Sequence, residues 1–412
     1  MDNSSQDLLR KIRWDDDTIS MLTIGRGLYK NSRLSFVSKA NSDYCRLGRC
    51  IAKNTHLNHL TIDLCSDSAL DITTNEFYEG LRQNQSISKL TIYGRNKSIM
   101  NSILHRILHV YKEKTNLTYL NIVGAKLENG GDTFIAECLR SCTHLEDVRL
   151  SICFINNEQL QPIVEAIRKH PSIKTLDLSS NNIGNELVLK TLLEDPESNI
   201  WSINLERNRI NNDCATMLAN SLENNTTLTN LNMIRQNIQW TDLVARRFPL
   251  YLARYTELLC NKSSINSTYK SNHTLNFLKL TTPPIRNINQ LPWRMPPHMT
   301  YLLNLNKDID KSRVAIKKIL QYHPKIDMAS LFEWNLDGEW TLKSLPYVVS
   351  WFERAKEAAA HDEETRFVDC PVSVFDVEKR KLSAVYQVAL AMPELIVPAS
   401  HVKAGKKRKR GK

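Results

Sequence analysis

The stretch that decides the fold runs from Leu176 to Gly184 and reads Leu-Asp-Leu-Ser-Ser-Asn-Asn-Ile-Gly. Its two leucines stand two positions apart, so in a β-strand both side chains point to one face while Asp177 points to the other. Asn181 follows three residues after Leu178, and a small polar side chain there can bond the buried backbone groups of a turn. The stretch therefore predicts a short strand that ends in a tight, inward-facing turn.

The same three apolar positions, spaced L-x-x-L-x-L, recur along the chain. The first seven copies start 30, 30, 28, 28, 27 and 28 residues apart, a regularity that chance apolar clusters do not keep, so stacked structural repeats are predicted. A related copy, Ile19 with Leu22 and Ile24, comes earlier, and this N-terminal unit is expected to carry an insertion or to form a cap. The copies begin at Leu57, Ile87, Leu117, Leu145, Ile173, Ile200 and Leu228, and an eighth follows a longer gap at Leu275.

The turn position three residues after the strand is filled in a similar way in other copies. Asn208, Cys65 and Cys153 occupy it, Gln236 lies close to it, and Ala125 departs from it. Small polar side chains there suit an inward-facing turn, because they can satisfy backbone groups that water does not reach. The early repeats are therefore more degenerate than the later ones.

The other half of each unit shows apolar residues at the three-four spacing of an amphipathic helix. One such stripe comprises Leu160, Ile163, Val164 and Ile167; another begins at Ala215, with Asn211, Asn212 or Asp213 as its N-cap. A unit of strand, turn and helix cannot bury both apolar faces alone, so neighbouring units must stack. The predicted fold is an α/β solenoid shaped like a horseshoe, with a concave parallel sheet and convex helices.

The rest of the chain differs in character from the repeats. Proline-rich sequence and then helical patterns, such as the stripe from Val314 to Leu320, follow the last copy, and a small helical region is expected to cover the open end of the sheet. The predicted organisation is a capping or irregular repeat at 1–56, the repeat domain at 57–282 with an insertion at about 240–274, a proline-rich linker at 283–298, a helical C-terminal region at 299–398, and a disordered basic tail at 399–412.

With these repeats in view, residues Ile173 to Asn237 resemble leucine-rich repeats of the ribonuclease-inhibitor type, and the resemblance extends roughly from Leu57 to Leu280. The segment from Ser267 to Leu275 is also similar to segments of lineage-expanded, intracellular leucine-rich-repeat proteins of microalgae. Members of the wider repeat class act as inhibitors, scaffolds, ubiquitin-ligase adaptors, immune-type sensors and activators of the small GTPase Ran. The resemblance implies the fold and macromolecular recognition, and it does not choose among these roles.

Composition and termini indicate an intracellular protein. The N-terminus lacks the apolar segment of a secretory signal, and no apolar run approaches the roughly 20 residues that span a bilayer. Nine cysteines, an odd number scattered over repeat positions, fit reduced thiols better than a disulfide framework. We expect the protein in the nucleus, the cytoplasm or both.

The net charge of +11 is concentrated in the tail. Seven of the 55 Lys and Arg residues lie between Lys403 and Lys412, which leaves 48 against 44 Asp and Glu in the body, so neither specific nucleic-acid binding nor membrane binding is expected. The tail is predicted to be a nuclear-import signal that binds an importin-type receptor, and the alternative is an idle, solubilising terminus. Its basic run comprises Lys406, Lys407, Arg408, Lys409 and Arg410.

A mixed polar stripe is predicted to line the concave face, because the residues between the apolar strand positions point away from the helices. Interleaved acids and bases would set the specificity for a protein partner, and the alternative is a merely solvated sheet face. The candidate partner-binding residues are Thr61, Tyr93, Asn121, Arg149, Asp177, Asn204, Glu206, Arg207, Asn232 and Arg235.

No catalytic, metal or cofactor site is predicted. Cys138, Cys142 and His144 lack the paired C-x-x-C spacing of a zinc site, and Cys138 fits a helix core. Neither an H-E-x-x-H nor a G-x-S-x-G motif occurs. We therefore predict a non-enzymatic scaffold or adaptor. The alternatives are a small-GTPase regulator resembling the Ran activator, although such activators commonly carry an acidic tail, and a ubiquitin-ligase substrate adaptor.

Overall fold

A computed structural model describes residues 3–25, 35–38, 40–65, 72, 74–94, 98–112, 114, 116–127, 130–184, 186–236, 252–280 and 295–323. The chain divides into two compact units. The first comprises Met1–Tyr255 with Thr274–Arg294, and the second comprises Thr256–His273 with Met295–Lys412. The basic tail, the proline-rich segment 281–294 and everything after residue 323 lie outside the described residues, so the predictions made for them remain predictions.

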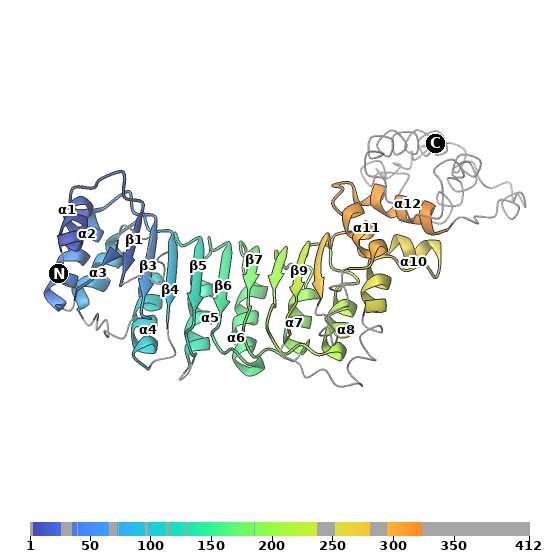
Figure 1. The fold of residues 1–412 in the computed structure, drawn as a ribbon, viewed down its shortest axis with the longest axis horizontal. Coiled ribbons are helices and arrows are strands. Elements are labelled where there is room, and N and C mark those ends of the chain that lie inside the picture. Colours follow the sequence, from blue (N-terminus) through green and yellow to red (C-terminus); the bar gives the residue numbers. More distant parts are fainter. Residues whose placement is uncertain are drawn as a thin grey trace, which may run out of the picture. The chain divides into compact units, whose positions relative to one another are not determined.

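The first unit is built on one ten-stranded sheet in which every pair of neighbouring strands is parallel. From β3 to β10 the order across the sheet is the order along the chain, as Figure 1 shows for the labelled strands. The strands are β1 (Met21–Ile24), β2 (Ser35–Phe36), β3 (His59–Asp63), β4 (Lys89–Tyr93), β5 (Tyr119–Val123), β6 (Asp147–Ser151), β7 (Thr175–Asp177), β8 (Ser202–Asn204), β9 (Asn230–Met233) and β10 (Phe277–Leu280).

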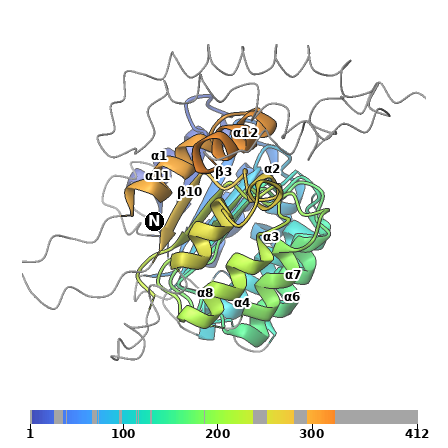
Figure 2. The same cartoon turned by 90° about the vertical axis from the view of Figure 1, so that its right-hand side faces the viewer.

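Each strand from β3 to β8 is followed by a helix, and Figure 2 shows α4, α6, α7 and α8 gathered on one side of the sheet. We call the other side, the counterpart of the predicted concave face, the open face. Asn211 caps α8 by accepting a hydrogen bond from the Cys214 amide, which selects one of the three expected caps. The helices of this unit are α1 (Asn3–Arg13), α2 (Asn41–Lys53), α3 (Asn75–Gln83), α4 (Ser98–Lys112), α5 (Gly131–Ser141), α6 (Asn157–Arg168), α7 (Glu186–Leu193) and α8 (Asn212–Ser221).

The strand register follows the apolar repeat. Leu60 pairs with Leu90, Leu90 with Leu120, and the same alignment continues through to Leu278 of β10. The irregular early copy obeys it too, because Leu22 pairs with Leu60 of β3. The repeated apolar positions are thus a continuous buried column between the sheet and the helices.

The turns after β7, β8 and β9 are held by the polar side chains that the sequence predicted there. The Asn181 amide nitrogen donates to the carbonyls of Leu178, at 2.9 Å, and of Leu150 in the preceding repeat, at 2.7 Å. Its amide oxygen accepts from the backbone amides of Cys153 and Ile155, each at 3.0 Å. Asn208 and Gln236 repeat this arrangement one and two units further on, so the inward-facing turn is confirmed.

A second column of polar side chains links the helix ends, three residues before the first apolar position in six of the copies. The Asn84 side chain donates to the carbonyls of Ile51, at 2.8 Å, and Asn54, at 2.7 Å, and it accepts from the Ile87 amide at 2.9 Å. Sequence analysis missed this column, although an asparagine three residues before the apolar position recurs. Its members, which we call the helix-end ladder, are Asn54, Asn84, Lys114, Cys142, His170 and Asn225.

The second unit contains α10 (Ile265–Tyr269), α11 (Pro297–Leu305) and α12 (Lys311–Tyr322), the last of which covers the predicted helical stripe. Lys318 of α12 is fully buried. Its ammonium group donates to the carbonyls of Leu259, at 2.6 Å, and Asn272, at 3.1 Å, and to Nδ1 of His273 at 3.0 Å. Burial lowers the pKa of Lys318 to about 7, and three acceptors stand in for water around its charged form.

Candidate partner-binding surface

The register places the predicted strand residues in one row across the open face. Thr61 and Asn121 stand in this row on β3 and β5, with Arg149, Asp177, Asn204 and Asn232 beyond them on successive strands. Tyr93 lies two positions further along its strand, nearer the turns. Accessibility varies along the row, because Arg149 is exposed whereas Thr91 is buried.

Arg149 is held in position by two residues that sequence analysis did not select. Its guanidinium donates to both carboxylate oxygens of Asp147, at 3.1 and 2.9 Å, and its central carbon lies 5.3 Å from the centre of the Tyr119 ring. The hydrogen bond to Asp147 is the main cause that raises the pKa of Arg149. Both partners lie in the row two residues before the predicted one. The same alternation that selected Arg149 also places that row on the open face.

A hydrogen-bonded group joins β8, β9 and the turns after them. The Asn232 amide nitrogen donates to the Asn204 side-chain oxygen at 2.9 Å and to the Glu206 carboxylate at 3.3 Å. Arg235 donates to the other oxygen of Glu206 at 3.2 Å, and Arg207 lies 3.8 Å from that oxygen. Five of the predicted residues therefore meet here, with two guanidinium groups beside one carboxylate.

Three of the predicted binding residues also stabilise the turns that follow their strands. The side-chain oxygens of Asp177, Asn204 and Asn232 accept hydrogen bonds from the backbone amides two residues later, at 2.8, 3.1 and 3.3 Å. An Asx turn of this kind explains why a short amide or carboxylate occupies these positions, whatever the surface binds.

Arg207 and Arg235 do not lie on the strands. They occupy the turns directly after β8 and β9, with left-handed backbones at φ 57° and 56°. The sequence predicted that both residues lie on the sheet face. The strands β8 and β9 end before they reach these residues, so both lie at the edge of the sheet. Their guanidinium groups still reach the open-face residue Glu206.

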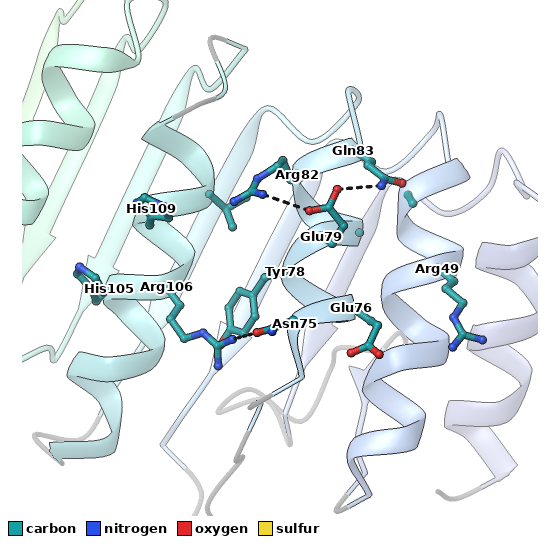
Figure 3. A pocket seen from close by; sticks show the side chains of 13 residues that line it. Arg49, Asn75, Glu76, Tyr78, Glu79, Arg82, Gln83, His105, Arg106 and His109 are labelled. Carbon is teal, nitrogen blue, oxygen red and sulfur yellow. Dashed lines mark hydrogen bonds and ion pairs between the residues drawn. The ribbon is translucent and has the colours of Figure 1, made fainter.

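A hollow of about 640 Å³ lies on the helical side of the sheet, between α2, α3 and α4 (Figure 3). Several of the side chains that line it contact one another: Glu79 accepts from Arg82 at 3.2 Å and from Gln83 at 2.9 Å. Arg106 donates to Asn75 at 2.6 Å and lies 4.1 Å above the Tyr78 ring. Several polar side chains of the hollow are therefore already engaged with one another.

The cysteines considered as metal ligands lie in the core. Cys138 and Cys142 are buried, their sulfurs 3.8 Å apart, and His144 is exposed. Within the part of the chain that the structure describes, no three His, Cys, Asp or Glu side chains are placed to share one metal ion. Over the same residues, no helix has the length and apolar character that crossing a bilayer requires.

Comparison with known proteins gives distant relatives. No family model matches the chain. It is 26% identical over 195 residues to NACHT, LRR and PYD domains-containing protein 9C of Mus musculus, which is 45% of this chain and 19% of that protein. Against NACHT, LRR and PYD domains-containing protein 14 of Homo sapiens it is 22% identical over 221 residues, or 50% of the chain and again 19% of the relative. The chain thus spans about a fifth of the length of these relatives.

Among solved structures, an internalin from Listeria monocytogenes matches with a TM-score of 0.33 at 13% identity, covering 68% of this chain and 91% of the internalin. The tropomodulin C-terminal domain of Caenorhabditis elegans matches with a TM-score of 0.26 at 18% identity, covering 38% and 93%. The in-register strand, turn and helix units, together with the relatives, identify the fold as a leucine-rich-repeat solenoid. The ribonuclease-inhibitor subtype remains a prediction.

Proposed function

We propose that this leucine-rich-repeat chain is a non-enzymatic scaffold or adaptor that binds a protein partner on the open face. The observation that supports it best is the setting of Arg149, an exposed cation fixed by Asp147 and stacked on Tyr119. A side chain that is already held in one geometry loses less entropy when a partner binds it. Tyr and Arg are also the residue types that most often dominate interface energies.

The charge pattern around Arg149 supports recognition of one partner surface over others. Asp147 lies on the same strand as the cation, Asp177 stands opposite the cation on the neighbouring strand β7, and the Glu206 group follows further along the sheet. Such alternation strengthens binding of a partner whose charges are complementary in the same order, and it weakens binding of a partner that places like charges opposite. No contact among the described residues favours the GTPase-regulator or ubiquitin-ligase alternative.

The substitution Arg149→Glu tests this proposal. It places a carboxylate beside Asp147 and removes the stacking on Tyr119, so the set of proteins labelled by a proximity-labelling fusion of the full chain should lose members. Arg140→Glu, on the exposed side of α5, is the matched control and should leave the set unchanged. Asp177 is left intact because its carboxylate also stabilises a turn.

The two labelled sets decide the outcome. Identical sets from Arg149→Glu and the unaltered chain, with both proteins equally stable in urea, mean that the open face around Arg149 is not the binding surface.

A further inference from the structure

The turns that end β5 to β9 share a left-handed residue at the same repeat position. The five residues have φ between 56° and 77°, and only one of them is glycine. Successive turns are joined by backbone hydrogen bonds, such as those from the Ile152 amide to Ser179 at 3.1 Å and from the Arg207 amide to Ile234 at 3.0 Å. The residues of this row are Gly124, Ile152, Ser180, Arg207 and Arg235.

The left-handed conformation favours glycine at all five positions, because a side chain there strains the backbone. The strain is worst for a β-branched residue such as Ile152. Gly124 shows that the repeat accepts glycine at this position. Folding alone therefore does not explain the side chains that the next four turns carry, and strain retained in this way points to a role outside folding.

A second row lies two residues further along the same turns and repeats the chemistry of the first. Phe154, itself left-handed at φ 56°, follows Ile152, and both apolar side chains are exposed, to 43% and 46%. Two repeats later, Arg209 follows Arg207 and is exposed as well. The apolar pair and the arginine pair stand about 10 Å apart, since two strand spacings separate them.

The arginine end of this edge carries excess positive charge. The side chains of Arg207 and Arg235 are 60% and 64% exposed, and both approach the single carboxylate of Glu206, which is 23% exposed. One carboxylate cannot neutralise two guanidinium groups, and Arg209 adds a third cation beside them.

We infer that the turn edge, defined as Ile152, Phe154, Arg207, Arg209 and Arg235, selects a protein partner that presents an acidic segment with one bulky apolar side chain about 10 Å from its carboxylates. The inference rests on the proposed function and names the chemistry of its partner. The apolar pair favours a protein over a nucleic acid, because Phe154 offers a base a stacking surface but the aliphatic Ile152 beside it does not, whereas an apolar side chain of a protein can pack against both.

The test is selection from a displayed library of random peptides on the full chain, followed by affinity measurements on the enriched peptides. Enriched sequences should combine Asp or Glu with a large apolar residue. Arg207→Gly and Arg235→Gly should each weaken binding of these peptides by about tenfold or more, while thermal stability stays equal or rises because glycine relieves the strain. Ile152→Gly should weaken the apolar preference, because only Phe154 of the apolar pair remains, and it should keep the acidic one.

Ser180→Gly is the matched control, because it changes the same backbone position between the two pairs and should leave affinity unchanged. Enriched peptides without acidic residues, or no enrichment at all, overturn the inference. Peptides whose affinity falls in Arg149→Glu but not in the arginine-to-glycine variants also overturn it, while leaving the open-face proposal intact. Equal binding of a single-stranded oligonucleotide that competes with the peptides shows that the partner class is wrong.

Discussion

His170 takes a position in the helix-end ladder that asparagine holds in Asn54, Asn84 and Asn225. Its Nδ1 accepts from the amides of Ser172, at 3.2 Å, and Ile173, at 3.1 Å, so the proton is on Nε2, which donates to the Cys142 carbonyl at 3.0 Å. The neutral ring thus makes the bonds that an asparagine amide makes elsewhere. Burial lowers the pKa of His170, and hydrogen bonds to backbone carbonyls oppose this shift only in part.

This lowered pKa predicts that the protein loses stability in mild acid. The unfolded chain takes up a proton at His170 below about pH 6.5 while the folded chain resists it, so stability is complete above that pH and falls below it, by at most about 1.4 kcal/mol per pH unit. The variant His170→Asn keeps the bonds without the titrating group. Urea unfolding at about pH 7.5 and about pH 5.5 should show a smaller loss for the variant than for the unaltered chain.

The comparison is between the two pH-dependent losses, because other histidines with lowered pKa, such as His273, contribute equally to both proteins. If His170→Asn loses as much stability as the unaltered chain, the ring does not titrate in the way its contacts indicate.

The polar side chains of the turns and those of the helix-end ladder differ in how well the sequence predicts them. The polar side chains of the turns were predictable because Asn181 and Asn208 keep the same residue type at the same offset. The helix-end ladder was not, because Lys114, Cys142 and His170 satisfy similar carbonyls with different chemistry. Geometry is repeated there more faithfully than residue identity.

At the scale of elements, α2 and α3 pack with their backbones in contact. A Cβ atom added to Gly80 would lie 2.1 Å from the Gly48 carbonyl oxygen, a backbone atom that cannot move aside alone. Gly80→Ala should therefore separate the two helices and cost about 1–3 kcal/mol in urea unfolding. Gly131→Ala, at the start of α5, is the control, because its nearest neighbour is the Leu127 side chain at 3.4 Å.

If the Gly80→Ala protein is as stable as the Gly131→Ala protein, α2 and α3 can accommodate a methyl group at this contact, and the prediction is wrong.

The elements themselves followed from the sequence where the apolar period was regular. The strands from β3 to β10 and their register agree with the repeat, because a one-residue slip would turn every apolar side chain to the open face. The positions of Arg207 and Arg235 did not follow, since the length of the three-residue β8 and the four-residue β9 is decided by where their turns close. Tyr119 and Asp147 were not predicted because the candidates were taken from the later positions of each strand, whereas these two residues lie two positions earlier on the same face.

At the scale of the whole molecule, most of the net positive charge belongs to the tail and not to the repeats. A short basic run of this kind predicts nuclear import. Replacing Lys406, Lys407, Arg408, Lys409 and Arg410 with alanine should shift a fluorescently tagged protein from the nucleus to the cytoplasm, measured as the nuclear fraction of the signal. Replacing only Lys403 and Lys412 leaves the run intact and should change nothing. An unchanged nuclear fraction in the first variant removes the import hypothesis.

The helix-end ladder has a consequence for how such a chain changes over evolution. Each member bonds to backbone carbonyls of the repeat before it, as Asn84 does to Ile51 and Asn54. For this ladder, a repeat therefore needs nothing from its predecessor beyond main-chain oxygens that every repeat offers. Duplication or loss of one unit in the gene would lengthen or shorten the sheet without a new fold. The length of the binding surface can therefore change by one repeat at a time.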